Sequence, residues 1–152
     1  MLHWKEGNII AWYNMGRTIV VPTNAGWTKE GANVMGAGIA KEIANVVPDL
    51  PAVYGKYCQS EETRVYLPEM RLILVPSKPL IPDTPWLSWK QNADPKTVRE
   101  SLSWLQANAK KFPTPVYVPL IGAGNGKLTP EAVSSLMDTL LTDECFIGVT
   151  WD

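Results

Sequence analysis

The sequence contains few of the residues that most often bind metals or act as acid–base catalysts. Of its 152 residues, one is histidine and two are cysteine. Cys58 and Cys145 stand far apart, and their spacing matches no zinc motif and no redox pair. We therefore expect two free thiols in a reducing compartment, no bound metal and no cofactor. Any catalysis would have to use His3, carboxylates, lysine, backbone amides or a metal from outside.

Long apolar runs and an excess of positive charge are also missing. No stretch approaches the ~18 apolar residues of a membrane span, and the first residues lack the apolar run of a signal peptide. We expect a cytoplasmic monomer that does not contact a membrane. The formal net charge is −1, which argues against general nucleic-acid binding. A small anionic ligand stays compatible with this charge, because backbone amides can bind phosphate.

The composition is that of a globular protein, with 45% hydrophobic and 19% charged residues, and predicts a single domain over residues 1–152. Two helices should begin at Asp94-Pro95 and Thr129-Pro130, where an N-cap acceptor precedes a proline. The order of the expected elements predicts a layered α/β fold with a largely parallel central sheet. The apolar patterns predict strands at 2–5, 18–22, 64–68, 71–76, 116–120 and 145–150, and helices at 37–47 and 50–57.

Two glycine-rich turns each lie between an expected buried strand and an expected helix. The first is residues 33–40 (NVMGAGIA) and the second is residues 122–128 (GAGNGKL). Glycines let a backbone approach a ligand closely, and amides at a helix N-terminus attract phosphate. Ligands of α/β proteins bind at the carboxyl ends of the strands. Two such turns therefore predict a diphosphate site, although tight turns alone would also explain the glycines.

The second turn does not match the common phosphate-binding motifs. A Walker loop requires Ser or Thr after Gly-Lys, but Leu128 follows Lys127, and Ile121 stands where the first glycine would be. The dinucleotide fingerprint requires glycine or alanine at Lys127, and in the first turn at Lys41. A different ligand class is therefore indicated.

Three motifs resemble those of the macrodomain family, which binds ADP-ribose. They are residues 5–10 (KEGNII), residues 21–26 (VPTNAG) followed by 35–40 (MGAGIA), and residues 119–128 (PLIGAGNGKL). They occur in the family's order and span nearly the whole chain. The MGAGIA form is similar to the branch that contains terminal ADP-ribose protein glycohydrolase and the antitoxin that removes ADP-ribose from DNA. The resemblance implies a three-layer fold with a mixed, mostly parallel sheet, and ADP-ribose or an ADP-ribosylated substrate as partner.

The resemblance also implies the residues of the site. Lys78 and Asn24 would be catalytic, with the Lys78 amine attacking the anomeric carbon of the distal ribose. Such a lysine must be neutral part of the time, which requires a lowered pKa; an ordinary exposed loop lysine is the alternative. The ligand-binding residues would be Asn8, Ile9, Asn24, Asn33, Met35, Gly36, Ala37, Gly38, Ile39, Ile121, Gly122, Ala123, Gly124, Asn125, Gly126, Lys127 and Leu128.

Two positions depart from the family pattern. Asn8 replaces the aspartate that contacts adenine, and Gly126 stands where glycohydrolases of this branch can carry an acidic residue. The second change weakens the case for acid–base hydrolysis and leaves binding intact. Other candidates are Trp151 as a cover for adenine, Trp27 and Trp86 at the rim, and Asp83 as a general base.

Three functions follow from these observations. The first is hydrolysis of an ADP-ribosyl bond, in an ADP-ribosylated macromolecule, O-acetyl-ADP-ribose or ADP-ribose 1″-phosphate. The second is binding of ADP-ribose or a related signalling nucleotide without turnover. The third is a different nucleotide-binding α/β domain that uses the same two turns.

Overall fold

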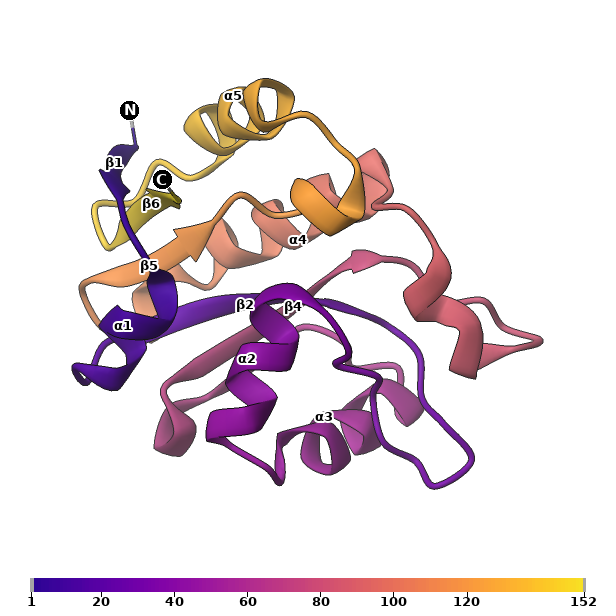
Figure 1. Cartoon of the computed structure of the whole chain (residues 1–152). Helices are drawn as coiled ribbons and strands as arrows, with labels where there is room; N and C mark the ends of the chain where they lie inside the picture. Colours follow the sequence, from indigo (N-terminus) through magenta and orange to yellow (C-terminus); the bar gives the residue numbers. More distant parts are fainter. Residues whose placement is uncertain (1, 152) are drawn as a thin grey trace.

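The structure, a computed structural model, describes residues 2–151, and at Asn125 it describes the backbone only. One six-stranded sheet has the strand order β1-β6-β5-β2-β4-β3 (Figure 1). β3 is antiparallel to β4, and every other neighbouring pair is parallel. The mixed, mostly parallel sheet is therefore confirmed. The strands are β1 (His3–Glu6), β2 (Thr18–Asn24), β3 (Val65–Leu67), β4 (Leu72–Lys78), β5 (Val116–Pro119) and β6 (Phe146–Thr150).

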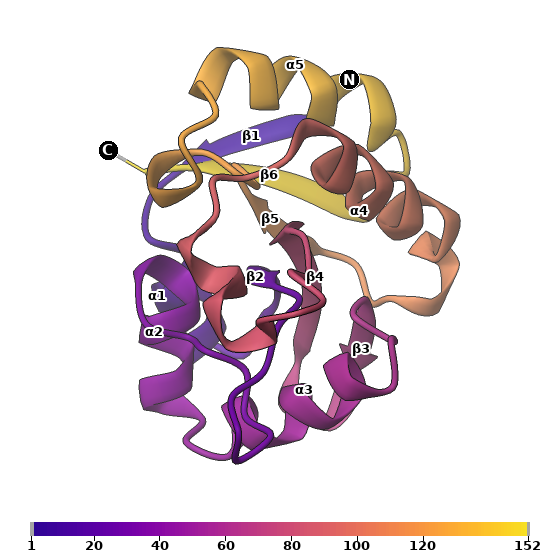
Figure 2. The same cartoon turned by 90° about the vertical axis from the view of Figure 1, so that its right-hand side faces the viewer.

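Helices cover both faces of this sheet and make three layers. Figures 1 and 2 show α4 and α5 on one side and α2 and α3 on the other, where α1 also packs. The α-helices are α1 (Ile9–Asn14), α2 (Gly38–Val46), α3 (Leu50–Gln59), α4 (Pro95–Ala107) and α5 (Pro130–Leu140). Short 3₁₀ turns are η1 (Pro68–Met70), η2 (Pro85–Lys90), η3 (Ala109–Lys111) and η4 (Gly124–Gly126).

The central strands have apolar side chains on both faces. In β2, Val20 packs on the side of α4 and α5, whereas Ile19 and Val21 pack on the side of α1, α2 and α3. All three side chains are completely buried. Because both faces of a central parallel strand are covered, its sequence is a continuous apolar run rather than an alternating one. Because β2 pairs in parallel with both β4 and β5, the carboxyl ends of these three strands lie together at one end of the sheet.

Two segments differ from the sequence-based expectations. Helix α1 was not predicted; it begins after Asn8, whose Oδ1 accepts a hydrogen bond from the Ile10 amide at 2.9 Å. With six residues it is too short for a clear helical period. No element was predicted between the strand ending at residue 76 and the helix starting at 94–95, but β4 continues to Lys78 and η2 forms in this proline-rich segment.

Other predictions agree with the structure. The helices at 94–95 and 129–130 begin as expected, with Pro95 and Pro130 as their first residues. Both cysteines are free and buried. Within residues 2–151, no helix is long and apolar enough to cross a membrane.

The N-cap of α4 gives a stability test. Asp94 Oδ2 accepts hydrogen bonds from the Thr97 amide at 3.0 Å and from Thr97 Oγ1 at 2.8 Å. We expect Asp94→Ala to lower the free energy of unfolding by about 1 kcal/mol, the usual value of such a cap. Asp49 holds the N-cap position of α3 without a side-chain hydrogen bond, so Asp49→Ala is the matched control and should change little. Urea denaturation measures both, and equal losses would contradict this assignment.

The contribution of the Asp94 cap should depend on pH. The hydrogen bonds from Thr97 lower the pKa of the Asp94 carboxyl below its usual range. The stabilisation is therefore present above the pKa of the carboxyl in the unfolded chain, and it is lost as pH falls through the pKa of the folded state. The difference in stability between the wild type and Asp94→Ala should shrink in acid.

Candidate functional site

A cavity of about 790 Å³ lies at the carboxyl ends of the parallel strands, between the two glycine-rich turns. Its walls come from the ends of β2, β4, β5 and β6, the beginnings of α1 and α2, the second turn and Trp89 of η2. The structure therefore brings together segments that are far apart in sequence. Among the residues named from the sequence, the cavity is lined by Asn8, Ile9, Asn24, Gly36, Ala37, Gly38, Ile39, Lys78, Gly122, Ala123, Gly124, Gly126 and Trp151.

The first turn delivers an uncapped helix N-terminus to this cavity. Ala37 occupies the N-cap position of α2 in extended conformation. Within residues 2–151, no side chain caps this helix, whereas α1, α4 and α5 are capped by Asn8, Asp94 and Thr129. The first amides of a helix have no intrahelical acceptor and carry a partial positive charge. The beginning of α2 therefore suits an anionic ligand.

The second turn presents a further free amide to the cavity. Gly122 and Gly124 have φ values of 91° and 65°, in the left-handed region that glycine tolerates best. Among the described residues the Gly122 N–H has no acceptor, whereas the parallel bridge between Ala123 and Leu128 directs the Gly124 N–H toward the Leu128 carbonyl. The amides of Ala123, Gly126, Lys127 and Leu128 bond to carbonyls within 120–124 and thereby fix the turn. These bonds hold the turn and leave the Gly122 N–H free for a ligand.

Packing explains why Gly126 carries no side chain. A Cβ atom at this position would lie 2.9 Å from Ala93 Cβ, and the Ala93 amide donates to the Gly126 carbonyl at 2.8 Å. A carboxylate cannot be placed here unless the segment before α4 moves away. Among the described residues, the carboxylate that lines the cavity belongs to the exposed Glu42 of α2, and Asp83 is exposed and lies outside the lining.

Lys78 and Asn24 are neighbours at the carboxyl ends of β4 and β2. The register of β2 and β4 pairs the two residues, with an irregularity just before Asn24. Lys78 is partly buried, and its Nζ donates to the Trp89 carbonyl at 3.0 Å. Burial, and then the positive charge of Lys127, lowers the pKa of Lys78. This is the direction required for an amine that acts as a nucleophile.

Asn24 and Asn33 hold the shape of the loop that joins β2 to α2, which we call the first loop. Asn24 Nδ2 donates to the Val34 carbonyl at 2.8 Å, and Asn24 Oδ1 accepts from the Gly26 amide at 3.0 Å. Asn33 is 2% exposed and does not line the cavity. Its Nδ2 donates to the carbonyls of Asn24 and Gly26. Asn33 was expected to contact ligand, but burial commits its amide to the loop; a contact between Asn24 and ribose stays a prediction.

Several other expected site residues lie off the cavity wall. Met35 and Ile121 are buried in the two hydrophobic cores, because their positions point toward the helices. Lys127 and Leu128, the last residues of the second turn, lie outside the lining, and Leu128 packs against the core on the side of α4 and α5. The side chain of Asn125 lies outside the described residues.

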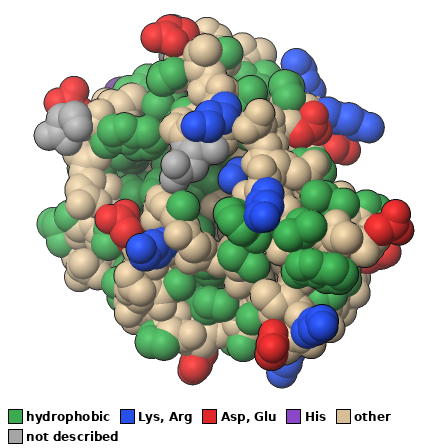
Figure 3. Space-filling view, turned by 45° about the vertical axis from the view of Figure 1, so that its right-hand side comes forward, with side chains coloured by type: hydrophobic (Ala, Val, Ile, Leu, Met, Phe, Trp, Pro, Cys, Tyr) green, Lys and Arg blue, Asp and Glu red, His purple; other side chains and the backbone are tan. Residues whose placement is uncertain are grey.

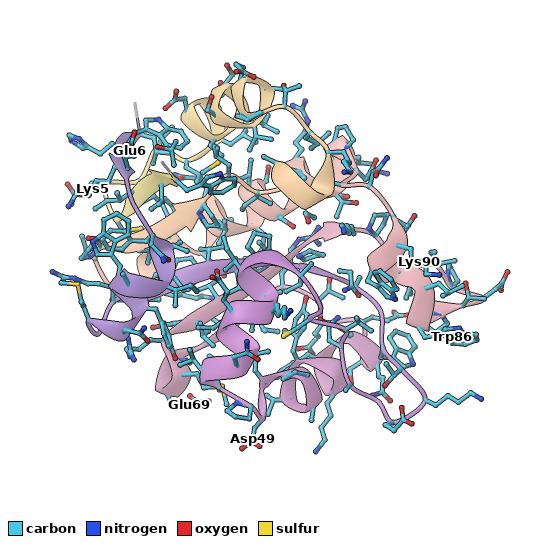
Figure 4. The ribbon with its side chains drawn as sticks, viewed as in Figure 1. Lys5, Glu6, Asp49, Glu69, Trp86 and Lys90 are labelled. Atoms are coloured by element: carbon cyan, nitrogen blue, oxygen red, sulfur yellow. The ribbon has the colours of Figure 1, made fainter. Side chains whose placement is uncertain are left out.

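The tryptophans divide between packing and exposure. Trp27 packs against the core beneath α2 and α3, and Trp86 points outward with Lys90 from η2 (Figure 4). Trp151 is 52% exposed and lines the cavity; a Cβ on Gly124 would lie 3.8 Å from its ring. Trp89 also lines the cavity, and no sequence signal distinguished it from Trp86.

The described residues on the face displayed in Figure 3 form no broad patch of basic side chains. Acidic and basic side chains are scattered there among hydrophobic and neutral ones. An anion in the cavity would therefore depend on backbone amides and on nearby lysines rather than on a broad basic surface.

Comparison with known proteins places the fold. No protein-family model matches the chain, and no curated protein matches it. The macrodomain of Thermus aquaticus DarG matches with a TM-score of 0.73 and 22% identity, over 98% of this chain and 97% of the other. The macrodomain of Mycobacterium tuberculosis DarG matches with a TM-score of 0.73 and 20% identity, over 99% and 97%. The chain has the macrodomain fold.

A third match adds a larger protein. Thermosipho africanus DarTG, solved in complex with ADP-ribose, matches with a TM-score of 0.67 and 23% identity, over 90% of this chain and 38% of that one. The expectation of a macrodomain fold is thus confirmed. Residues of both glycine-rich turns line the cavity.

The influence of Lys127 on Lys78 can be measured directly. Lys127→Met removes a like charge, so the ammonium form of Lys78 becomes more favourable and its pKa should rise. The exposed Lys90 is not among the groups that shift Lys78, and Lys90→Met serves as the control. An NMR titration of labelled lysine side chains reports both variants. The same Lys78 titration in Lys127→Met and in the wild type would refute the coupling.

Proposed function

We propose that this macrodomain binds ADP-ribose, with the diphosphate between the two glycine-rich turns. The observation that carries the proposal is the presence of free amides from two segments that line one cavity: the uncapped beginning of α2, and the N–H group of Gly122 in the second turn. Free amides at a helix N-terminus and in a glycine turn are suited to phosphate oxygens. The complex of the similar DarTG with ADP-ribose supports this choice of ligand.

The lining suggests how the ligand lies. The adenine end would be near Asn8 and Trp151, where an amide side chain and an exposed aromatic ring meet the cavity. The distal ribose would be near Lys78 and Asn24, at the ends of β4 and β2. A volume of about 790 Å³ falls within the range usual for pockets that bind ligands of this size.

We further propose that the protein hydrolyses an ADP-ribosyl derivative, an ADP-ribosylated macromolecule or ADP-ribose 1″-phosphate. The lone pair of the neutral Lys78 amine forms a bond to the anomeric carbon, and the bond from that carbon to the leaving group breaks with its electron pair. The nitrogen, which is positively charged after the attack, loses a proton, and the leaving group takes up one proton, so the step is neutral overall. Water then cleaves the adduct, which releases ADP-ribose and regenerates the amine. The lowered pKa of Lys78 supports this role.

One observation favours binding without turnover as a second candidate. The packing of Gly126 against Ala93 excludes a carboxylate from the second turn, so the cavity lacks an acid–base group at that place. A protein that only sequesters ADP-ribose or a related nucleotide needs the amides and not Lys78.

Ligand selectivity tests the binding proposal. We expect calorimetry to give a micromolar Kd for ADP-ribose and at least about tenfold weaker binding of ADP, ATP and NAD, because the loops and the sheet edge would contact both riboses. Absence of binding by the folded protein at ~1 mM ADP-ribose would overturn the proposal.

Lys78→Ala separates hydrolysis from binding. If the amine attacks the ribose, single-turnover cleavage should slow by at least about 100-fold, while the Kd for ADP-ribose stays within about threefold. Substrates to compare are an ADP-ribosylated peptide, an ADP-ribosylated oligonucleotide and ADP-ribose 1″-phosphate. Lys90→Ala, an exposed lysine on η2, is the control and should keep full activity. Equal cleavage by Lys78→Ala and the wild type would leave binding alone as the function.

A further inference from the structure

A segment between β4 and α4 crosses the edge of the sheet at which β2 and β4 end (Figure 2). We call residues 79–93 the strap; it contains η2 and Trp89, whose carbonyl accepts the hydrogen bond from Lys78 Nζ at 3.0 Å. We propose that the strap is a positioning device, which holds the Lys78 amine at the cavity through the Trp89 carbonyl. The inference rests on the proposed role of Lys78 as nucleophile.

The strap is held in shape by its own polar side chains. Ser88 is completely buried, and its Oγ accepts a hydrogen bond from the Ile81 amide at 3.0 Å. Gln91 Nε2 donates to the carbonyl of Pro79, the residue directly after Lys78. These two bonds close the strap on itself on both sides of Trp89. The position of the Trp89 carbonyl is therefore fixed relative to the end of β4.

The strap also contacts the first loop and the second turn. Gly26 of the first loop packs so closely that a Cβ there would lie 2.0 Å from the Pro85 carbonyl. At the other end, the Ala93 amide donates to the Gly126 carbonyl of the second turn at 2.8 Å. A single segment thus sets the distance of Lys78 from the two walls of the cavity.

This arrangement orients the amine. A neutral lysine that donates one N–H to the Trp89 carbonyl has its lone pair on another side of the nitrogen, away from that carbonyl. Lys78 and Trp89 both line the cavity. A ligand in the cavity therefore meets an amine whose rotation about the Cε–Nζ bond is already fixed. Fixing the nucleophile before the substrate arrives lowers the entropic part of the barrier.

The strap covers Lys78 on the side of the Trp89 carbonyl. Burial is the largest cause of the lowered pKa of this amine, and the charge of Lys127 from the second turn is the other. A loosened strap removes the carbonyl acceptor, which by itself would lower the pKa, but it also admits water. Because burial is the larger cause, the pKa should rise and the neutral amine should become rarer at neutral pH.

Two variants loosen the strap without touching the cavity lining, and one control matches them. Gln91→Ala removes the bond to Pro79, and Ser88→Ala leaves the Ile81 amide without its acceptor. The control is Gln106→Ala: this half-buried glutamine likewise ties a loop, accepting from the amides of Thr142 and Asp143 between α5 and β6.

The first measurement is an NMR titration of Lys78, which requires no turnover. We expect the pKa of Lys78 to rise in Gln91→Ala and Ser88→Ala and to stay at the wild-type value in Gln106→Ala. Single-turnover rates at neutral pH should fall by roughly three- to tenfold in the two strap variants, and their pH profiles should move to higher pH, with the Kd for ADP-ribose within about twofold.

The outcomes separate the two proposals. An unchanged Lys78 titration in both strap variants would overturn the positioning role, whatever the activity. A raised pKa in both variants supports the positioning role even if the wild type cleaves no substrate, in which case only the proposed hydrolysis fails.

Discussion

The site depends on backbone amides that have no hydrogen-bond acceptor in the described part of the chain and lie at the carboxyl ends of the parallel strands. The beginning of α2 has no side-chain cap, and the N–H group of Gly122 has no acceptor within the described residues. Buried or half-buried amides without acceptors are costly, and native structures seldom leave them without a purpose. The parallel sheet brings both sets to the same cavity. A dianionic diphosphate is the ligand group that best satisfies them together.

The rest of the site serves to hold these donors still. In the first loop, the amides of Asn24 and Asn33 bond to Val34, Gly26 and each other. In the second turn, three amides bond within the turn and that of Ala123 bonds to the Leu120 carbonyl just before it. The strap then fixes Lys78 with respect to both. A site whose donors are fixed before binding loses little entropy when the ligand arrives. Fixed loops of this kind would support the proposed selective binding in a chain with a net charge of −1.

Much of this organisation could be predicted from the sequence, because it depends on local signals. Apolar runs marked the central strands, and Asp94-Pro95 and Thr129-Pro130 marked two helix starts. The glycine spacing in the two turns, and Lys78 at the end of its strand, indicated the cavity and its amine. What could not be predicted depended on tertiary context. Asn33 looks like an exposed loop residue in the sequence, but packing under the first loop buries it.

Short elements and loop folds also escaped prediction. Helix α1 has one cap and too few residues to show a period. The proline-rich sequence of the strap predicted no regular element, and only the folded strap brings Trp89 rather than Trp86 to the cavity. Glu42 had a usable signal, since it lies one helical turn after Gly38 and therefore on the same face of α2.

The most direct test of the central claim is a titration with ADP-ribose followed through backbone amide resonances. We expect the amides of Gly38, Ile39 and Gly122 to shift together along one saturation curve, because one diphosphate contacts both turns. Gly16, in the turn after α1 and away from the cavity lining, should keep its resonance. Saturable shifts confined to one turn, or centred on residues outside the cavity, would contradict the claim that two sets of amides bind the diphosphate.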